Sequence, residues 1–295
     1  MKRILLTGAS GFVGRQIHAA LHAQGHQVIP WRSLGKDFFL ADQRRAALAL
    51  CQPEIIVHAA WYVEHGKFWD APENTAWQTA SMAFAEEAQK VGVQRFVGLG
   101  TCYEYAWPSD GLCDERVTPT AVHTRYDAAK AALRDHLLHL GDSMGWSTAW
   151  ARLFLLYGPG EGPKRLGPSV ARALLRGGLA QCGSGSAVRD FSDVRDVGAG
   201  ITALALSPVE GCVNIASGIA LSIREFVEAI AGFLGASERV RFGARPDPSH
   251  EPLRLVAATQ RLREEVGFQS ALSLEAGIAA LCVEQRALLE REALV

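Results

Sequence analysis

Residues 4–14 read Ile-Leu-Leu-Thr-Gly-Ala-Ser-Gly-Phe-Val-Gly, and this stretch decides the fold. A short apolar run, residues 4–6, leads directly into glycines at 8, 11 and 14, and apolar residues then recur at helical spacing up to Gly25. A glycine turn between a strand and a helix lets the backbone N–H groups of the helix N-terminus face an anion. The sequence therefore predicts a loop that binds the pyrophosphate of a dinucleotide, through Gly8, Ser10, Gly11, Phe12, Val13 and Gly14.

Short apolar strands and longer helices alternate beyond this loop. Strands are predicted at residues 28–29, 55–57, 95–99 and 148–156, and helices at 46–50, 75–91 and 126–140, the last ending at Gly141. This alternation is typical of an α/β fold of the Rossmann type, a doubly wound parallel sheet. Beyond residue 157 Gly and Pro become frequent, and helices such as 223–234 mix with isolated strands. We therefore predict a dinucleotide-binding domain, residues 1–160 with 191–215, and a smaller intercalated C-terminal substrate-binding lobe, residues 161–190 with 216–295.

The composition argues against several classes of protein. The 295 residues are 48% hydrophobic and carry a formal net charge of −1, which disfavours a nucleic-acid partner and an anionic membrane surface. No apolar stretch approaches the ~20 residues that span a bilayer, and the early glycines interrupt any signal peptide, so we expect a cytoplasmic protein. Six scattered cysteines without C-x-x-C or zinc spacing predict reduced, mostly buried thiols and no metal site.

The end of the second predicted strand indicates which dinucleotide binds. An NAD site places a carboxylate there for the ribose hydroxyls, whereas this chain has Arg32 and Ser33. A guanidinium and a hydroxyl suit the 2′-phosphate of NADP. We therefore expect NADP(H), with NAD(H) as the alternative. Asp42, which follows the apolar residues 38–40, is a candidate partner of the adenine amine.

Tyr126 and Lys130 lie four residues apart and therefore on one face of a predicted helix. A phenol has a reference pKa of about 10, and a nearby ammonium together with a positive nicotinamide ring favours the phenolate and lowers that pKa. Tyr126 would then exchange a proton with a carbonyl or alcohol oxygen. Thr101 follows the strand at 95–99, and ligands bind at the carboxyl ends of parallel strands. Its hydroxyl would hold the substrate oxygen beside Tyr126.

Further motifs extend this pattern along the chain. They are residues 56–60 (I-V-H-A-A), Asn74 at the start of the next helix, residues 152–159 (R-L-F-L-L-Y-G-P), residues 189–197 (R-D-F-S-D-V-R-D-V) and residues 213–216 (V-N-I-A). Together with the glycine loop and the Tyr–Lys pair, they make the sequence resemble the extended short-chain dehydrogenase/reductase family over nearly its full length. This family comprises NAD(P)-dependent sugar-nucleotide epimerases, dehydratases and reductases.

The resemblance implies roles for individual residues. Thr101, Tyr126 and Lys130 would be the catalytic triad, and Lys130 would also hold the nicotinamide ribose. Ala59, Ala60 and Leu153 would join the cofactor site, and Cys102 and Arg189 would contact the substrate, Arg189 at its diphosphate. The family also implies a homodimer that packs through helices near 75–90 and 126–140.

Positions at which this chain differs from the motifs of family members argue against two of the family's reactions. The 4,6-dehydratases place Asp-Glu directly after the catalytic Thr, where this chain has Cys102 and Tyr103; Glu104 comes one place late and is expected to point elsewhere. The 3,5-epimerase-reductases that make GDP-fucose carry a Cys in the position of Tyr103. Both activities are therefore disfavoured.

The activity that the sequence then favours is NADPH-dependent reduction of a keto group on a nucleotide-activated sugar. Residues 100–105 (G-T-C-Y-E-Y) look like bacterial reductases of nucleotide-linked 4-keto-6-deoxyhexoses. The alternatives are an NAD-dependent nucleotide-sugar 4-epimerase and an NADPH-dependent reductase of a non-sugar carbonyl. Leu155 favours the last, because many family members have a phosphate-contacting Asn there. A non-catalytic dinucleotide sensor is disfavoured because Tyr126 and Lys130 are both present. Trp61, Tyr62, Trp69 and Trp107 are expected in loops beside the site, either stacking on substrate or packing the loops.

Overall fold

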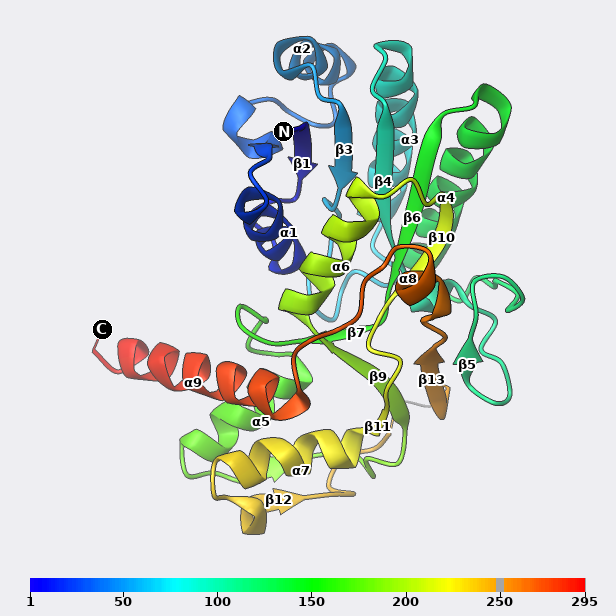
Figure 1. Cartoon of the computed structure of the whole chain (residues 1–295). Coiled ribbons are helices and arrows are strands. Elements are labelled where there is room, and N and C mark those ends of the chain that lie inside the picture. The colour runs from blue at the N-terminus through cyan, green and yellow to red at the C-terminus, as the bar shows by residue number, and fades with distance from the viewer. Residues whose placement is uncertain (248–251, 295) are drawn as a thin grey trace.

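A parallel sheet forms the centre of the computed structural model, which describes residues 1–247 and 252–294 (Figure 1). Within the described residues six strands lie in the order β10-β6-β4-β3-β1-β2, and every pairing between them is parallel. Their bounds are β1 (Arg3–Thr7), β2 (Gln27–Pro30), β3 (Ile55–His58), β4 (Arg95–Thr101), β6 (Ser147–Leu153) and β10 (Gly211–Ile215). The strand order reverses between β1 and β3, and ligands of such sheets bind at the carboxyl ends beside this point. The predicted Rossmann-type fold is confirmed.

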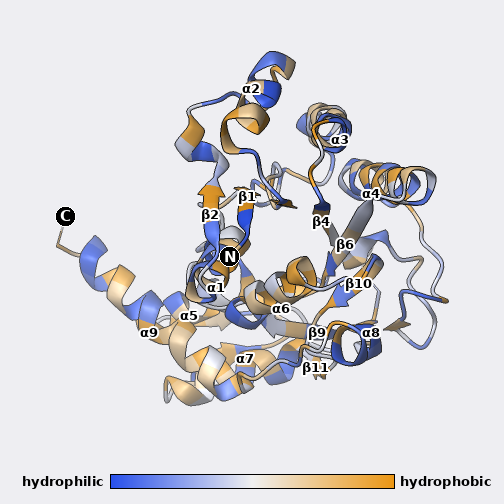
Figure 2. Cartoon of the chain, turned by 45° about the horizontal axis from the view of Figure 1, so that its top comes forward, coloured by the Kyte–Doolittle hydropathy of each residue, from blue (hydrophilic) through white to orange (hydrophobic). Residues whose placement is uncertain are grey.

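Helices cover both faces of this sheet (Figure 1). One face carries α1 (Phe12–Ala23) and α6 (Val194–Leu206); the other carries α2 (Ala41–Cys51), α3 (Glu73–Lys90) and α4 (Arg125–Met144). Successive residues of β1 supply opposite faces, since Ile4 and Leu6 pack with α1 and α6 whereas Leu5 packs with α2 and α3. Both faces need apolar residues, so the strands are continuous apolar runs. Figure 2 shows that α6 is correspondingly hydrophobic along most of its length.

Helix α4 extends beyond its predicted end at Gly141. The helix continues to Met144 and ends where Gly145 adopts the left-handed conformation, with φ of 60°. A Cβ on Gly141 would lie 2.6 Å from Thr148 Oγ1 at the start of β6. The predicted boundary is therefore wrong: Gly141 allows the helix to approach the sheet, and Gly145 ends the helix.

The second lobe lies below the sheet in Figure 1 and contains a second set of strands. These are β11 (Ala220–Ser222), β9 (Val188–Asp193), β13 (Arg254–Ala257) and β5 (Leu112–Cys113), with β7 (Leu155–Tyr157) beside β9, and a separate pair of β8 (Ala180–Gln181) and β12 (Val240–Arg241). Helices α5 (Leu166–Leu175), α7 (Ile223–Phe233) and α9 (Leu274–Glu292) surround a core that includes Tyr157, Phe226 and Leu281. This core is separate from the two hydrophobic layers of the central sheet.

The chain passes repeatedly between the two lobes. The predicted strand 148–156 is divided at Phe154, so that β6 stays in the central sheet while β7 pairs with β9. Strand β5 also joins the second sheet, and α8 (Gln260–Glu264) returns to pack its Leu262 under the central one. The predicted domain division stays a prediction: residues 1–160 with 191–215 in one domain, and 161–190 with 216–295 in the other. The crossings described above show which strands pass from one lobe to the other.

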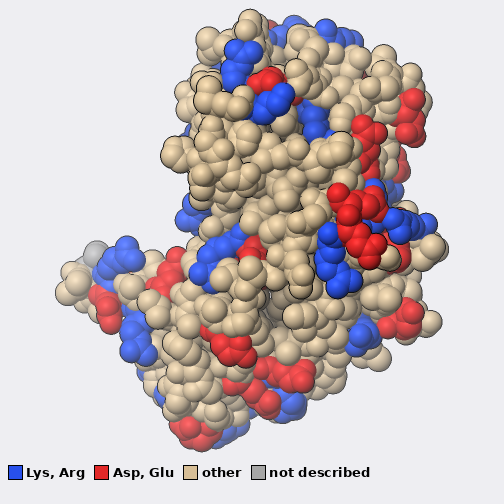
Figure 3. Space-filling model, viewed as in Figure 1, with Lys and Arg blue, Asp and Glu red and all other residues tan. Residues whose placement is uncertain are grey.

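The surface and the cysteines agree with the composition. All six cysteines lie in the described residues and are unpaired, and five of them are buried, as predicted. Positive and negative side chains are interspersed on the face shown in Figure 3. None of the helices formed by the described residues has the length and apolar character to cross a membrane. Across residues 1–247 and 252–294, no cluster of three or more His, Cys, Asp or Glu could hold a metal ion.

Candidate active site

The glycine loop between β1 and α1 fits a dinucleotide pyrophosphate. Gly8 has a φ of 70°, and a Cβ there would lie 2.7 Å from backbone atoms of Ala59 and Ala60. A Cβ on Gly14 would overlap the carbonyl of Gly8, so α1 packs directly on the turn. Gly11 is the N-cap of α1, and no side chain caps the helix there. The first N–H groups of α1 are therefore available for an anion, as the motif predicts.

A buried hydrogen-bonded chain fixes this loop against β3. The Ala60 N–H donates to Thr7 Oγ1 (3.1 Å), which lies 2.8 Å from His58 Nδ1, and His58 Nε2 lies 2.8 Å from Ser81 Oγ in α3. Burial lowers the pKa of His58 to about 3, with the positive charge of Lys130 adding to the effect. His58 is therefore a neutral structural link that brings Ala59 and Ala60 beside the glycine loop.

The residues after β2 include the predicted contacts to the adenosine end of a dinucleotide. Arg32 and Ser33 form part of a short 3₁₀ helix, η1 (Trp31–Leu34), and both are exposed. Ser33 Oγ donates to Pro30 O (2.7 Å), so this hydroxyl already has a backbone acceptor. Among the described residues no hydrogen bond or ion pair holds the Arg32 guanidinium. Asp42 lies exposed in the first turn of α2.

Tyr126 and Lys130 lie in the first two turns of α4, as the Y-x-x-x-K spacing predicts. Lys130 Nζ donates to Leu99 O in β4 (2.8 Å) and lies 6.0 Å from the centroid of the Tyr126 ring. The Tyr126 N–H donates to Trp69 O (2.9 Å), which attaches the start of α4 to the loop after β3. The two side chains therefore lie together at the carboxyl end of β4.

Burial is the largest influence on the pKa values of this pair. Burial, and after it the negative charge of Glu104, raise the pKa of Tyr126. Burial lowers the pKa of Lys130 to about 7, although Glu104 opposes the shift. In this arrangement removal from water outweighs the neighbouring ammonium and raises the pKa of Tyr126. The predicted lowering also invokes the positive nicotinamide ring, and it stays a prediction. Tyr126 is held as a protonated phenol, the form that donates a proton.

Thr101 ends β4 and begins a short 3₁₀ helix, η2 (Cys102–Glu104). Its Oγ1 accepts a hydrogen bond from the Tyr103 N–H (3.3 Å), and its own N–H donates to Glu104 Oε1 (2.9 Å), which makes a capping box. This pairing sets the orientation of the hydroxyl and leaves its proton to be donated elsewhere. Leu153 of β6 is the register partner of Thr101 and lies at the same edge of the sheet.

Two residues beside Thr101 point into the protein. Cys102 is 1% exposed and packs among Tyr105, Cys113 and Leu255, and burial raises the pKa of its thiol. Its predicted role as a substrate contact is therefore not supported, because the side chain belongs to a hydrophobic cluster. Glu104 is fully buried and accepts hydrogen bonds from Arg134 and Arg152, so it points away from the reaction centre as predicted.

Aromatic side chains surround the Tyr–Lys pair. Lys130 Nζ lies 3.9 Å above the Trp61 ring, and Trp61 Nε1 donates to Asn74 Oδ1 (2.9 Å). Phe68 and Trp69 approach the Tyr126 ring edge-on, with centroid distances of 4.9 Å and 5.9 Å. Asn74 also donates to the Phe68 and Ala71 carbonyls, which folds this loop over α4.

The other predicted aromatic residues lie farther from the pair. Trp107 stacks on His123 at 3.9 Å, and Tyr62 donates to the exposed Glu64.

The residue predicted to contact the substrate diphosphate, Arg189, lies in the second lobe, and its role stays a prediction. Arg189 lies in β9 and is 3% exposed, and its Nη1 donates to Val188 O (3.0 Å). The adjacent Asp190 accepts hydrogen bonds from the Ser217, Gly218 and Ala257 N–H groups. Leu155 stands at the start of β7, beside β9. The predicted substrate-binding residues of this lobe are thus in neighbouring strands.

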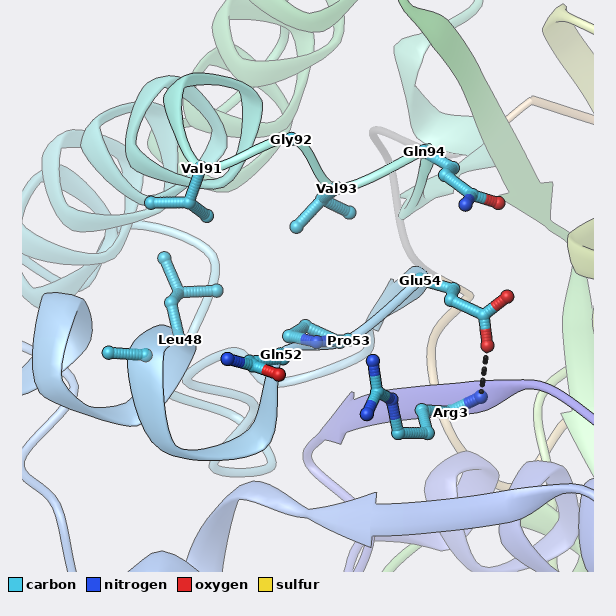
Figure 4. Close-up of a pocket in the computed structure, with 10 residues that line it drawn as sticks. Arg3, Leu48, Gln52, Pro53, Glu54, Val91, Gly92, Val93 and Gln94 are labelled. Atoms are coloured by element: carbon cyan, nitrogen blue, oxygen red, sulfur yellow. Dashed lines mark hydrogen bonds between the residues drawn. The ribbon is translucent and has the colours of Figure 1, made fainter.

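A surface pocket lies at the opposite edge of the sheet. Figure 4 shows that Arg3, Glu54 and Gln94, at the amino ends of β1, β3 and β4, line it together with Leu48 and Val91. The carboxyl ends of parallel strands, not the amino ends, hold ligands in this fold. Within the pocket the Arg3 N–H donates to Glu54 Oε2 (2.9 Å), an interaction between strand starts. We therefore place the candidate active site at the Thr101 edge.

Sequence reasoning missed three features of the site. It did not single out Phe68, it gave Trp61 no contact with Lys130, and it found no partner for Glu104. One signal was present, because Arg134 follows Tyr126 and Lys130 at the same four-residue spacing on α4. Contacts of the loop residues carry no such local signal.

Comparisons with known proteins agree with this geometry. The NAD dependent epimerase/dehydratase family matches residues 4–216, more than two thirds of the chain. A UDP-glucose 4-epimerase of Mycolicibacterium smegmatis is 29% identical, covering 94% of this chain and 96% of its own length. A GDP-6-deoxy-D-mannose reductase of Pseudomonas aeruginosa is 26% identical, covering 95% and 96%.

A solved structure, that of RMD from Pseudomonas aeruginosa complexed with NADPH, has the same fold. It superimposes with a TM-score of 0.86 at 22% identity, covering 98% of this chain and 100% of that one. Family and relatives together make this chain an enzyme of the extended short-chain dehydrogenase/reductase type that uses a nicotinamide cofactor. With its glycine loop, its parallel sheet and its Tyr–Lys pair, the chain belongs to the NAD dependent epimerase/dehydratase family.

Proposed function

We propose that the enzyme reduces a keto group of a nucleotide-activated sugar with NADPH, and that the sugar is a 4-keto-6-deoxyhexose. The observation that carries the proposal is the position of Tyr126, whose ring centroid lies 6.0 Å from Lys130 Nζ at the carboxyl end of β4. Burial also raises the pKa of its phenol, which favours the form that donates a proton. A ketone reductase needs one proton donor for the developing alkoxide, and Tyr126 supplies it.

The residues present divide the work of such a reduction. Reduced nicotinamide, when bound, supplies a hydride to the carbonyl carbon. Thr101 Oγ1 donates a hydrogen bond that holds the carbonyl oxygen. Tyr126 gives its proton to that oxygen, forming the alcohol, and regains a proton from solvent. Lys130 orients the ribose of the cofactor and stabilises the tyrosinate while it lasts.

The scarcity of acid–base groups supports a simple hydride transfer. Elimination of water or epimerisation beside a ketone needs a further acid or base next to the sugar ring. Cys102 and Glu104 do not offer one, since Cys102 is packed in a hydrophobic cluster and Glu104 is held by two arginines. A 4-epimerase needs no such group, and it remains the second candidate.

Two observations support the cofactor and substrate assigned. Arg32 is exposed directly after β2, and η1 contains no carboxylate for the ribose hydroxyls of NAD, which supports NADP(H). One relative is named a GDP-6-deoxy-D-mannose reductase, which supports the reduction. The relative with 29% identity is named a UDP-glucose 4-epimerase, which keeps that activity as the alternative.

The experiment follows oxidation of NADPH and NADH by the purified enzyme. Each cofactor is tested against GDP-, dTDP-, UDP- and CDP-linked 4-keto-6-deoxyhexoses. Oxidation of NADPH with one nucleotide class supports the proposal and identifies the nucleotide. No oxidation, together with NAD that remains bound through purification, supports the 4-epimerase. No oxidation and no retained cofactor contradicts both and favours a non-sugar carbonyl.

A further inference from the structure

Glu104 occupies an unusual place beneath the candidate active site. Its carboxylate is fully buried directly below the end of β4. A Cβ on Gly100 would overlap this carboxylate and the Trp150 indole, and a Cβ on Gly98 would lie 2.5 Å from the same indole. The two glycines of β4 therefore make room for a buried charge and the ring beside it. The turn after β4 would not by itself require glycine at these two positions.

Five donated hydrogen bonds satisfy this carboxylate. Oε1 accepts from the Thr101 N–H (2.9 Å) and from Trp150 Nε1 (3.0 Å). Oε2 accepts from Arg134 Nη1 (2.8 Å), from Arg152 Nε (3.3 Å) and from Trp150 Nε1 (3.1 Å). The partners come from β4, α4 and β6, so one side chain joins three elements. Removing the negative charge of Glu104 would leave the buried guanidinium groups of Arg134 and Arg152 without this carboxylate as a partner.

These partners connect both halves of the reaction centre. The Thr101 N–H sets the turn that aims the Thr101 hydroxyl. Arg134 lies on the same face of α4 as Tyr126 and Lys130, about two turns after Tyr126 and one turn after Lys130. The carboxylate therefore holds the strand that carries the hydroxyl against the helix that carries the phenol and the ammonium.

We propose that Glu104 is a positioning residue, which fixes the Thr101 hydroxyl relative to Tyr126 and Lys130 and supplies the negative charge that this pair experiences. The inference rests on the proposed reduction only for its rate measurement. The groups that face Glu104 are Arg134 from α4, Arg152 from β6 and Cys212 from β10, with Lys130 and Tyr126 at longer range. Lys130 also faces His58 from β3.

The test compares Glu104→Gln with a matched substitution elsewhere. Glu87→Gln removes a carboxylate from another buried pair, in which Arg44 Nε lies 2.8 Å from Glu87 between α2 and α3, away from Thr101. Because a displacement of about 1 Å at a reaction centre costs about 100-fold in rate, Glu104→Gln is expected to lower kcat by about 100-fold. Glu87→Gln is expected to lower the thermal stability and leave kcat unchanged.

A second readout needs no substrate. The chain has six lysines, so isotopically labelled lysine gives resolved NMR signals, and Lys130→Met identifies the signal of Lys130. Lys130 is expected to titrate near pH 7, at a lower pH in Glu104→Gln and at the unchanged pH in Glu87→Gln. Glu104→Asp, which keeps the charge, is expected to restore the titration more fully than the rate.

The outcomes separate the two proposals. If the Lys130 titration shifts while no keto sugar is reduced, the positioning role stands and the proposed function fails. If Glu104→Gln loses stability but keeps both kcat and the Lys130 titration, the carboxylate is merely structural and the inference is overturned. If Glu104→Gln does not fold, Arg134→Gln is used instead, because it removes the ion pair between Glu104 and α4 by changing the arginine. It is then expected to lower kcat and to raise the pKa of Lys130, and an unchanged rate and titration would refute the inference.

Discussion

Two properties of Tyr126 suit a proton donor: burial raises the pKa of its phenol, and its place in the first turn of α4 lies close to Lys130. A general acid placed in this way contributes about 10²–10⁴-fold to the rate. We predict that Tyr126→Phe lowers kcat by this amount and leaves NADPH binding unchanged, since the ring is kept and the hydroxyl alone is lost. Steady-state kinetics and a fluorescence titration of NADPH measure the two effects.

Tyr62→Phe is the matched control for this substitution. Tyr62 loses a hydrogen bond to the exposed Glu64 and lies outside the pair, so both measurements should equal those of the wild type. Equal rates for Tyr126→Phe and Tyr62→Phe would remove Tyr126 from the mechanism.

Arg32 is the residue that we propose to select NADPH over NADH. A charge-assisted hydrogen bond contributes about 1.5–3 kcal/mol, so Arg32→Ala should weaken NADPH binding by about 10–150-fold. NADH, which has no 2′-phosphate, should bind as before. Isothermal titration with both cofactors measures the change, and Arg45→Ala, on the exposed side of α2, is the control. Parallel losses for NADPH and NADH would mean that Arg32 does not recognise the phosphate.

Residues whose role depends on local spacing could be predicted from the sequence. Residues whose role depends on partners far away in the chain could not. The glycines at 8, 11 and 14 and the pair of Tyr126 and Lys130 each lie within one turn or loop, so the sequence pattern alone indicated them. Glu104 finds its partners 30 and 48 residues away, and the sequence could indicate that it points inward but not what it meets. The burial that raises the pKa of Tyr126 could not be predicted from the sequence for the same reason, because burial is a property of the folded chain.

At the scale of elements, β1, β3 and α3 are joined through the neutral imidazole of His58. Its pKa is about 3 in the folded protein and about 6.5 in the unfolded chain. Above pH 6.5 neither form is protonated and the stability is complete. As the pH falls from 6.5 toward 3 the unfolded chain takes up a proton that the folded protein refuses, so the stability should fall by about 1.4 kcal/mol per pH unit.

Urea unfolding at pH 8 and pH 5.5 measures this effect. The difference in unfolding free energy between the two pH values should be about 1.4 kcal/mol smaller in His58→Asn than in the wild type. His22→Asn, an exposed position of α1, should keep the wild-type difference. Identical pH dependences in all three proteins would show that His58 is not the group responsible.

The ends of elements were harder to predict than their existence. Each strand of the central sheet was expected within a few residues, because its apolar run is buried on both faces. The end of α4 was misplaced because a glycine can either stop a helix or let it pack closely, and Gly141 does the second. The strand predicted at residues 148–156 is divided at Phe154 because its last residues pair with β9 of the second sheet. Nothing in the sequence of residues 148–156 indicates that pairing.

At the scale of the whole molecule, α3 and α4 lie side by side on the outer face of the sheet (Figure 1). We predict that this face forms a homodimer, so sedimentation at micromolar concentration should give twice the chain mass of 31.8 kDa. Ala76→Arg places a charge on the exposed face of α3 and should yield the monomer. Ala23→Arg, exposed at the end of α1, should stay dimeric, and a wild-type monomer would contradict the prediction.

The repeated passage of the chain between the lobes has a consequence for protein engineering. A fragment that ended at residue 216 would keep β9 but lose β11 and β13, its neighbours on either side. A fragment that began there would lack β5, β7 and β9, and its α8 would have no β10 to cover. Neither half is a module that can be expressed or exchanged by a single cut. Grafting the specificity of a relative onto this sheet would require replacing several separate segments together.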